Sequence, residues 1–192
     1  MVRFITGNAL KEFMVACDQV ESGYGEQYKL YCKLITEEFN ETIEADNVTE
    51  IIDGVIDSIW VSEGLKNTID YNKYHQYDVD YELRPFLLNE YVDLISKFKN
   101  INTNYKLISQ LFDAKILSIS EIDDYIVSLI EYGLKFVDIV TLQDCWDEVK
   151  RSNMSKISEN GKVLKNEFGK VVKPETFSPA DIKSILQKHF YI

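Results

Sequence analysis

Residues 34–65 read LITEEFNETIEADNVTEIIDGVIDSIWVSEGL, and this stretch decides the fold. It holds nine acidic side chains and no lysine or arginine. Apolar residues recur among the acids at three- and four-residue spacing, which is typical of helices that bury one face. The Asp46-Asn47 turn divides the stretch between two helices, which we expect at about 26–45 and 48–65. Because the turn is short, the helices should pack antiparallel with their acidic faces toward each other.

Each predicted helix gathers its acids on one face. Like charges three or four positions apart destabilise a helix by roughly 0.2–0.5 kcal/mol per pair. No basic residue within the stretch offsets this repulsion, so we expect a divalent cation to do so. Carboxylate oxygens suit Mg²⁺, and Mn²⁺ could substitute for it. The acids concerned are Glu37, Glu38 and Glu41 on the first helix and Glu50, Asp53 and Asp57 on the second.

A plainer explanation applies to the same acids. An acidic run is most often a solvated helix face. Asn47-Val48-Thr49-Glu50 also has the pattern of a capping box, in which Asn47 caps the second helix and Glu50 occupies its third position. The apolar residues between the acids argue against full solvation, because they predict that both helices are substantially buried.

A second motif, SNMSK at residues 152–156, lies near the C-terminus. Residues 162–173 then alternate around a turn and predict a small β-hairpin. Residues 150–173 carry seven Lys or Arg and two Glu, a net charge of +5, so the rest of the chain carries −16. A basic segment would help an acidic site to bind a polyanion, although a solvated hairpin explains the same charges.

Together the two motifs resemble the all-α nucleoside triphosphate pyrophosphohydrolases, which include the MazG-like enzymes, the dimeric dUTPases and phosphoribosyl-ATP pyrophosphohydrolase. Glu-Glu-x-x-Glu followed by Glu-x-x-Asp, within residues 37–53, is similar to their carboxylate signature. SNMSK followed by a Gly-Lys hairpin is similar to a C-terminal segment of a phage and bacterial branch. The resemblance covers roughly residues 10–62 and 142–182.

The resemblance implies a Mg²⁺-dependent enzyme that cleaves a (d)NTP to a (d)NMP and pyrophosphate, for nucleotide-pool control. It implies a homodimer or homotetramer in the cytoplasm of a cell or of a phage-infected host. The implied metal ligands are Glu37, Glu38, Glu41, Glu50 and Asp53.

The resemblance also assigns roles around the metal. Glu38 or Glu37 would deprotonate the attacking water. Asn153 and Lys156 would bind the nucleotide, and Asp57, one helical turn beyond Asp53, would complete the substrate site.

The chain departs from this pattern in three places. The gap between Glu41 and Glu50 is short, and Tyr31 stands where relatives often carry arginine. Residues 66–138 match no motif, so we expect a single domain, 1–192, with a helical insertion there. Within that region, residues 67–84 are polar and rich in tyrosine, which predicts a loop.

The rest of the chain completes an all-α bundle with one hairpin. Periodicity predicts helices at about 10–20, 85–98 and 103–113. The capping box Ser118–Glu121 opens a further helix through about Leu134, and Thr141 and Asp144 open one through about Met154. A last helix opens at Ser178-Pro179.

Composition narrows the class of protein. A hydrophobic content of 45% over 192 residues is typical of an ordered globular domain. The net charge of −11 disfavours binding to nucleic acid or to anionic membranes. No apolar run is long enough to span a bilayer, and no signal peptide is expected. The three cysteines, Cys17, Cys32 and Cys145, lack metal-type spacing and predict buried free thiols in a reducing cytoplasm.

Two other functions fit an acidic helical chain. One is a non-catalytic DNA mimic or interaction module that occupies a basic groove, and the other is a structural protein whose acids serve solubility. A mimic should spread its acids over its surface, whereas here they concentrate on two adjoining helices beside a basic segment. Only the enzyme requires site-specific Mg²⁺ or Mn²⁺.

Overall fold

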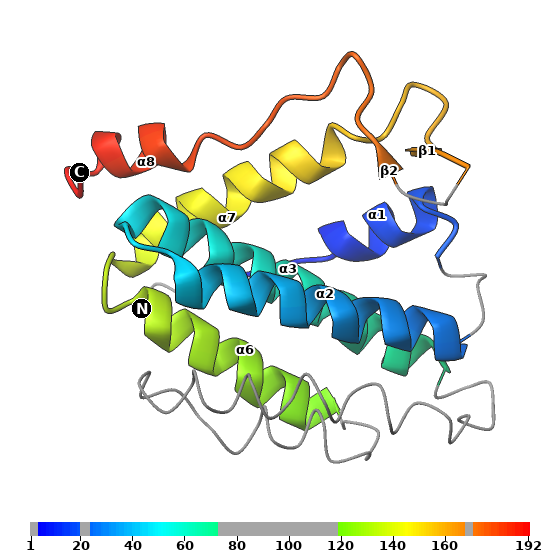
Figure 1. The fold of residues 1–192 in the computed structure, drawn as a ribbon, viewed down its shortest axis with the longest axis horizontal. Helices are drawn as coiled ribbons and strands as arrows, with labels where there is room; N and C mark the ends of the chain where they lie inside the picture. Colours follow the sequence, from blue (N-terminus) through cyan, green and yellow to red (C-terminus); the bar gives the residue numbers. More distant parts are fainter. Residues whose placement is uncertain (1–3, 20–23, 73–118, 168–170) are drawn as a thin grey trace.

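The structure is a computed structural model that describes residues 4–19, 24–72, 119–167 and 171–192. The described chain is mostly helical, with a single two-stranded antiparallel sheet (Figure 1). This confirms the predicted helical class and the small C-terminal hairpin. The helices expected at about 85–98 and 103–113 lie outside the described residues.

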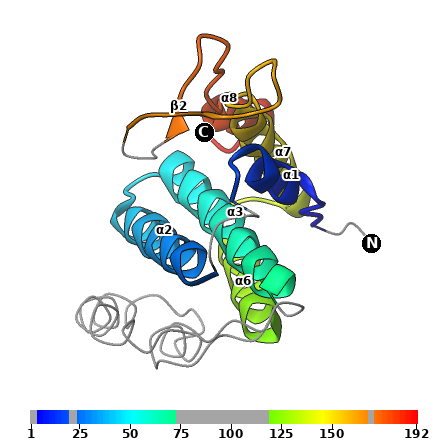
Figure 2. The same ribbon diagram turned by 90° about the vertical axis from the view of Figure 1, so that its right-hand side faces the viewer.

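The elements form a bundle around one central helix. Helix α3 packs against α1, α2, α6, α7 and α8, and Figure 2 shows it between α2 and α7. The strands β1 and β2 pair antiparallel, with Leu164 opposite Val172. The elements in chain order are α1 (Ala9–Ala16), α2 (Tyr24–Glu44), α3 (Val48–Asn72), α6 (Ile119–Gly133), α7 (Ile139–Met154), β1 (Leu164–Lys165), β2 (Val171–Val172) and α8 (Ile182–Lys188).

Helices α2 and α3 run antiparallel and approach closely at two glycines of α3 (Figure 1). A Cβ added to Gly54 would lie 2.5 Å from Thr42 Oγ1, and one added to Gly64 would lie 1.9 Å from a ring carbon of Tyr31. Both distances are far below van der Waals contact. Glycine therefore lets the two helices pack together at these positions.

Tyr31 fills the space above Gly64. Its side chain is buried, and its hydroxyl donates a hydrogen bond to Gln19 Oε1 at 2.8 Å. The position at which relatives of the resembled superfamily often carry arginine is thus occupied here by a packing residue.

The core lies on both sides of α3. Ile52, Ile56 and Ile59 are fully buried, and each such side chain contributes about 1.5–3 kcal/mol on leaving water. Trp60 of α3 meets Trp146 of α7 with ring centroids 5.7 Å apart. These contacts explain why the second acidic helix cannot be a fully solvated element.

Helix α3 is longer than predicted, and helix α1 is shorter. Helix α3 continues to Asn72, so the prediction of a loop from residue 67 is wrong over residues 67–72. Helix α6 ends at Gly133, one residue before the predicted end, and packs on α3. Helix α1 ends at Ala16, because Asp18 takes a left-handed conformation with φ of 54° that no helix can continue.

Two helix starts were also misplaced by the sequence patterns. Helix α7 begins at Ile139, because the Asp138 carboxylate caps it by accepting hydrogen bonds from the backbone N–H groups of Val140 and Thr141. Helix α8 begins at Ile182 rather than at Pro179, because Asp181 caps it by accepting from Ser184 N at 3.0 Å. In both cases an aspartate takes the capping role.

We expect Gly64→Ala to destabilise the protein. Alanine gains up to about 1 kcal/mol in helix propensity, but the overlap with Tyr31 should cost roughly 1–3 kcal/mol or more. Urea unfolding measures the balance. Gly133→Ala is the control, because the nearest atom to its added Cβ would lie at 3.0 Å rather than at 1.9 Å. Equal stability of Gly64→Ala and the parent would contradict the close α2–α3 packing.

Candidate functional site

Four acids from α2 and α3 interact with one another near the connection between the helices. The carboxyl of Glu38 responds to the charges of Glu41 and Asp53, and that of Asp57 responds to all three. We call Glu38, Glu41, Asp53 and Asp57 the acidic cluster. Acids of the two antiparallel helices therefore lie within electrostatic range of one another.

Burial and mutual repulsion raise the pKa values of three acids in the cluster, Glu38, Asp53 and Asp57. Glu38 is half-buried, and burial, followed by the charges of Glu41, Asp53 and Glu37, raises its pKa to about 7. Burial and then the charge of Glu41 raise the pKa of Asp53. Burial raises the pKa of Asp57 well above its usual range, and Glu38 raises it further.

The remaining two predicted ligands, Glu37 and Glu50, are not part of the acidic cluster. Glu37 faces Lys33 across 3.6 Å, and half of its side-chain surface is exposed. Glu50 is exposed, and its N–H donates to Asn47 Oδ1 at 3.1 Å, which confirms Asn47 as the helix cap. Glu50 is not among the charges that shift the pKa values of Glu38, Asp53 or Asp57.

Lys156 joins the acidic cluster from the other end of the chain. It follows α7, is half-buried, and interacts electrostatically with Asp57 and Glu38. Its Nζ donates a hydrogen bond to Oδ1 of the buried Asn153 at 2.6 Å. Burial lowers the pKa of Lys156, whereas the two carboxylates favour its charged form. The structure thus brings the two sequence motifs together, although about a hundred residues separate them.

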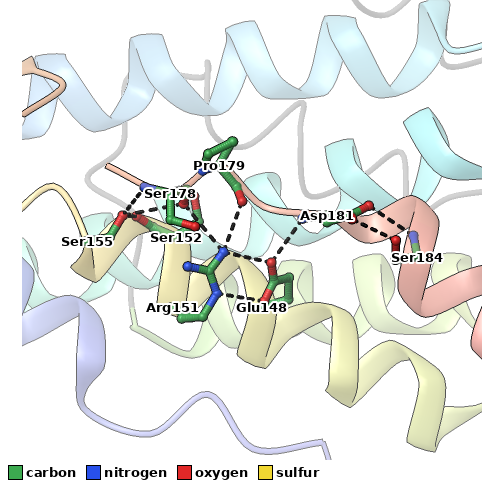
Figure 3. Close-up of polar contacts among 8 residues, drawn as sticks. All are labelled: Glu148, Arg151, Ser152, Ser155, Ser178, Pro179, Asp181 and Ser184. Carbon is green, nitrogen blue, oxygen red and sulfur yellow. Dashed lines mark hydrogen bonds and ion pairs between the residues drawn. The ribbon is translucent and has the colours of Figure 1, made fainter. Parts of the chain in front are cut away.

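A strap, residues 173–181, crosses the end of α7 and is fastened by Arg151 and Glu148 (Figure 3). Arg151 makes two 2.8 Å hydrogen bonds to the Glu148 carboxylate and donates to the Pro179 carbonyl at 2.9 Å. Glu148 accepts from Asp181 N at 3.0 Å. No pattern in the sequence pointed to this clamp.

The described residues contain no group of three or more His, Cys, Asp or Glu side chains arranged to hold one metal ion. The carboxylate oxygens of the acidic cluster are nevertheless the donors that Mg²⁺ prefers. They meet the chemical requirement for a hard cation without forming a closed coordination shell. The Mg²⁺ site therefore stays a prediction.

The three thiols have no role in this site. Cys17, Cys32 and Cys145 are free and buried, as predicted. Burial raises the pKa of Cys17 to about 11 and that of Cys32 and Cys145 to about 12, so none is a nucleophile at neutral pH.

No protein family, no curated protein and no solved structure matches this chain. None of the helices within the described ranges is long and apolar enough to cross a membrane. The chemistry of the site has to be inferred from its own residues.

We expect Glu38→Gln to change how stability depends on pH. The carboxyl titrates near 4.5 when unperturbed and at about 7 in the folded protein, so the unfolding free energy of the parent should fall as pH rises through this interval. Glu38→Gln should flatten the decline and be more stable than the parent at pH 8. Urea unfolding from pH 5 to 8 without divalent metal measures both effects.

The control for this series is Glu131→Gln, which removes an exposed carboxylate from α6. It should keep the parental pH dependence. If Glu38→Gln and Glu131→Gln follow the same curve, Glu38 does not titrate as the structure indicates.

We expect Arg151→Ala to loosen the strap. The substitution removes the Glu148 ion pair and the hydrogen bond to Pro179, and hydrogen bonds to charged groups contribute about 1.5–3 kcal/mol each when well ordered. Arg151 is partly exposed, so a total loss of about 1–2 kcal/mol is expected. Limited proteolysis should cut within residues 173–181 faster than in the parent. Lys183→Ala, on the exposed face of α8, should leave both measurements unchanged.

Proposed function

We propose that this protein is a Mg²⁺-dependent nucleoside triphosphate pyrophosphohydrolase, which hydrolyses a (d)NTP to a (d)NMP and pyrophosphate. The observation that carries the proposal is the electrostatic interaction of the half-buried Lys156 with Asp57 and Glu38. A solvated acidic face does not require a half-buried ammonium group, because burying one is costly. A site that binds both a cation and a polyphosphate requires both signs of charge.

The acidic cluster is the part that would hold the metal. We expect Glu38, Glu41 and Asp53 to be the principal ligands, with Glu37 and Glu50 as additional ones. The repulsion that raises the pKa of Glu38 to about 7 is the kind that a divalent cation relieves. Bound Mg²⁺ would neutralise phosphate charge and acidify the attacking water.

The residues of the chain divide the remaining work. Water attacks the α-phosphorus, and the bond from that phosphorus to the oxygen bridging to the β-phosphorus breaks. Glu38 accepts the proton that the water loses, for which a carboxylate held inside the site is better placed than Glu37, which faces Lys33 in solvent. Lys156 donates to phosphate oxygens, and Asn153 holds its ammonium group in place.

The assembly and setting follow from the resemblance to the pyrophosphohydrolases. A homodimer or homotetramer that acts on nucleotides in the cytoplasm is part of the proposal.

Asp57 interacts electrostatically with the proposed metal ligands Glu38 and Asp53 and also with Lys156. We expect it to support substrate binding rather than proton transfer.

The test is a screen of the common NTPs and dNTPs with Mg²⁺, Mn²⁺ or chelator, with monophosphate and pyrophosphate detected separately by chromatography. We expect both products in equal amounts, with the activity lost in chelator. Glu38→Gln should lower kcat by about a hundredfold or more, since a general base contributes roughly 10²–10⁴. Glu131→Gln should keep parental kinetics.

Thermal melting gives a second readout for the metal. Mg²⁺ should raise the Tm of the parent by mass action, and Asp53→Asn should reduce that shift. If no nucleotide is hydrolysed with either metal and the Tm does not move, the protein is not this enzyme. The other function that the charge pattern allows is an acidic module that binds a basic groove of a partner protein. A pull-down of such basic partners would then be the next experiment.

A further inference from the structure

Two lysines share one aromatic ring beside the acidic cluster. The Nζ of Lys173 lies 4.7 Å from the ring centroid of Phe177, and the Nζ of Lys156 lies 5.9 Å from it. Both are within the distance of about 6 Å at which a ring face attracts a cation. Phe177 is half-buried, and Lys173 is exposed. The ring therefore lies near both the half-buried ammonium group of Lys156 and the exposed one of Lys173.

The two ammonium groups differ in their countercharges. Lys156 interacts with Asp57 and Glu38, whereas Lys173 has no carboxylate within ion-pair distance in the part of the chain that the structure describes. The charge of Lys173 also disfavours the charged form of Lys156, so the two repel each other. A bound anion that reaches both would relieve the repulsion and supply the missing countercharge.

The strap fixes this arrangement. Phe177 N donates to the Pro174 carbonyl at 2.9 Å, which closes a turn directly after Lys173. The next residue, Ser178, donates its N–H to Ser155 Oγ at 3.0 Å, and Arg151 holds the following carbonyl (Figure 3). Phe177 and Lys173 are thus tied to the end of α7, from which Lys156 also projects. The cations are set at one place before any ligand arrives.

We propose that Lys156, Lys173 and the ring of Phe177 form the binding site for the β- and γ-phosphates of the substrate, with Lys173 in direct contact with the leaving pyrophosphate. The acidic cluster then lies on the side of the α-phosphorus, where the water attacks. The identity of the ligand as a nucleotide rests on the proposed function, whereas the affinity for a polyphosphate does not. Charge on the departing pyrophosphate is what two lysines would stabilise.

The experiment is a calorimetric titration of the protein with inorganic pyrophosphate in the presence of Mg²⁺. Lys173→Ala should weaken binding about ten- to a hundredfold, because it removes a charge-assisted contact. Lys173→Arg should bind within a few-fold of the parent, since it keeps the charge above the ring. Phe177→Leu, which retains apolar volume in the strap, should weaken binding by about three- to tenfold.

The matched controls are Lys135→Ala and Tyr132→Leu. They disrupt a similar pair, with Nζ 5.4 Å from the ring centroid, at the end of α6. Both should bind pyrophosphate as the parent does. If Lys173→Ala binds like the controls, or if the parent does not bind pyrophosphate, the inference is wrong. An equal loss in Lys173→Ala, Phe177→Leu and both controls would also overturn it, because the effect would not be specific to this ring.

The test of nucleotide hydrolysis and the test of pyrophosphate binding can fail independently. If binding depends on Lys173 but no NTP is hydrolysed, the polyphosphate site stands and the proposed reaction falls. If NTPs are hydrolysed and Lys173→Ala retains parental KM and kcat for all of them, the reaction stands and the role of Lys173 falls.

Discussion

The close packing of α3 against α2 is the constraint on which the rest of the structure depends. Gly54 and Gly64 remove the side-chain atoms that would hold the helices apart, and Thr42 and Tyr31 occupy the space. Helix α3 is then covered by α1, α6, α7 and α8, so its apolar side chains are buried all round. The acids at the start of α3 cannot move away from those of α2, because the core fixes both helices. Apolar burial thus maintains a charge arrangement that would not persist by itself.

That arrangement has an electrostatic cost, which Lys156 only partly offsets. Burial opposes charge on Glu38 and Asp57 and on Lys156, while the opposite charges favour each other. Replacing such groups with apolar ones is often neutral or stabilising, so their presence is not explained by stability. Groups with shifted pKa values that face one another from separate elements are common at functional sites. This is the physical reason for placing the chemistry at the acidic cluster.

Local patterns in the sequence predicted what local interactions determine. The Asn47 cap, the helix pair and the hairpin each depend on residues a few positions apart, and all three are present. The start of α8 was missed because Pro179 is held by Arg151, from another element, and Asp181 caps the helix instead. Only the resemblance, and no periodicity, suggested that Lys156 would lie near the acids of α2 and α3. Phe177 carried no signal at all, because a single aromatic residue in a polar segment has no pattern.

The uneven charge along the chain acquires a spatial meaning in this fold. Residues 150–173 carry +5 and the rest −16, and Lys156 of the basic segment interacts electrostatically with Asp57 and Glu38 of the acidic part. An acidic surface that served only solubility or mimicry would gain nothing from a half-buried lysine held by the buried amide of Asn153. A ligand that carries a divalent cation and several phosphates presents both signs of charge within a few ångströms. A site with carboxylates on one side and ammonium groups on the other is complementary to that ligand, and to few others.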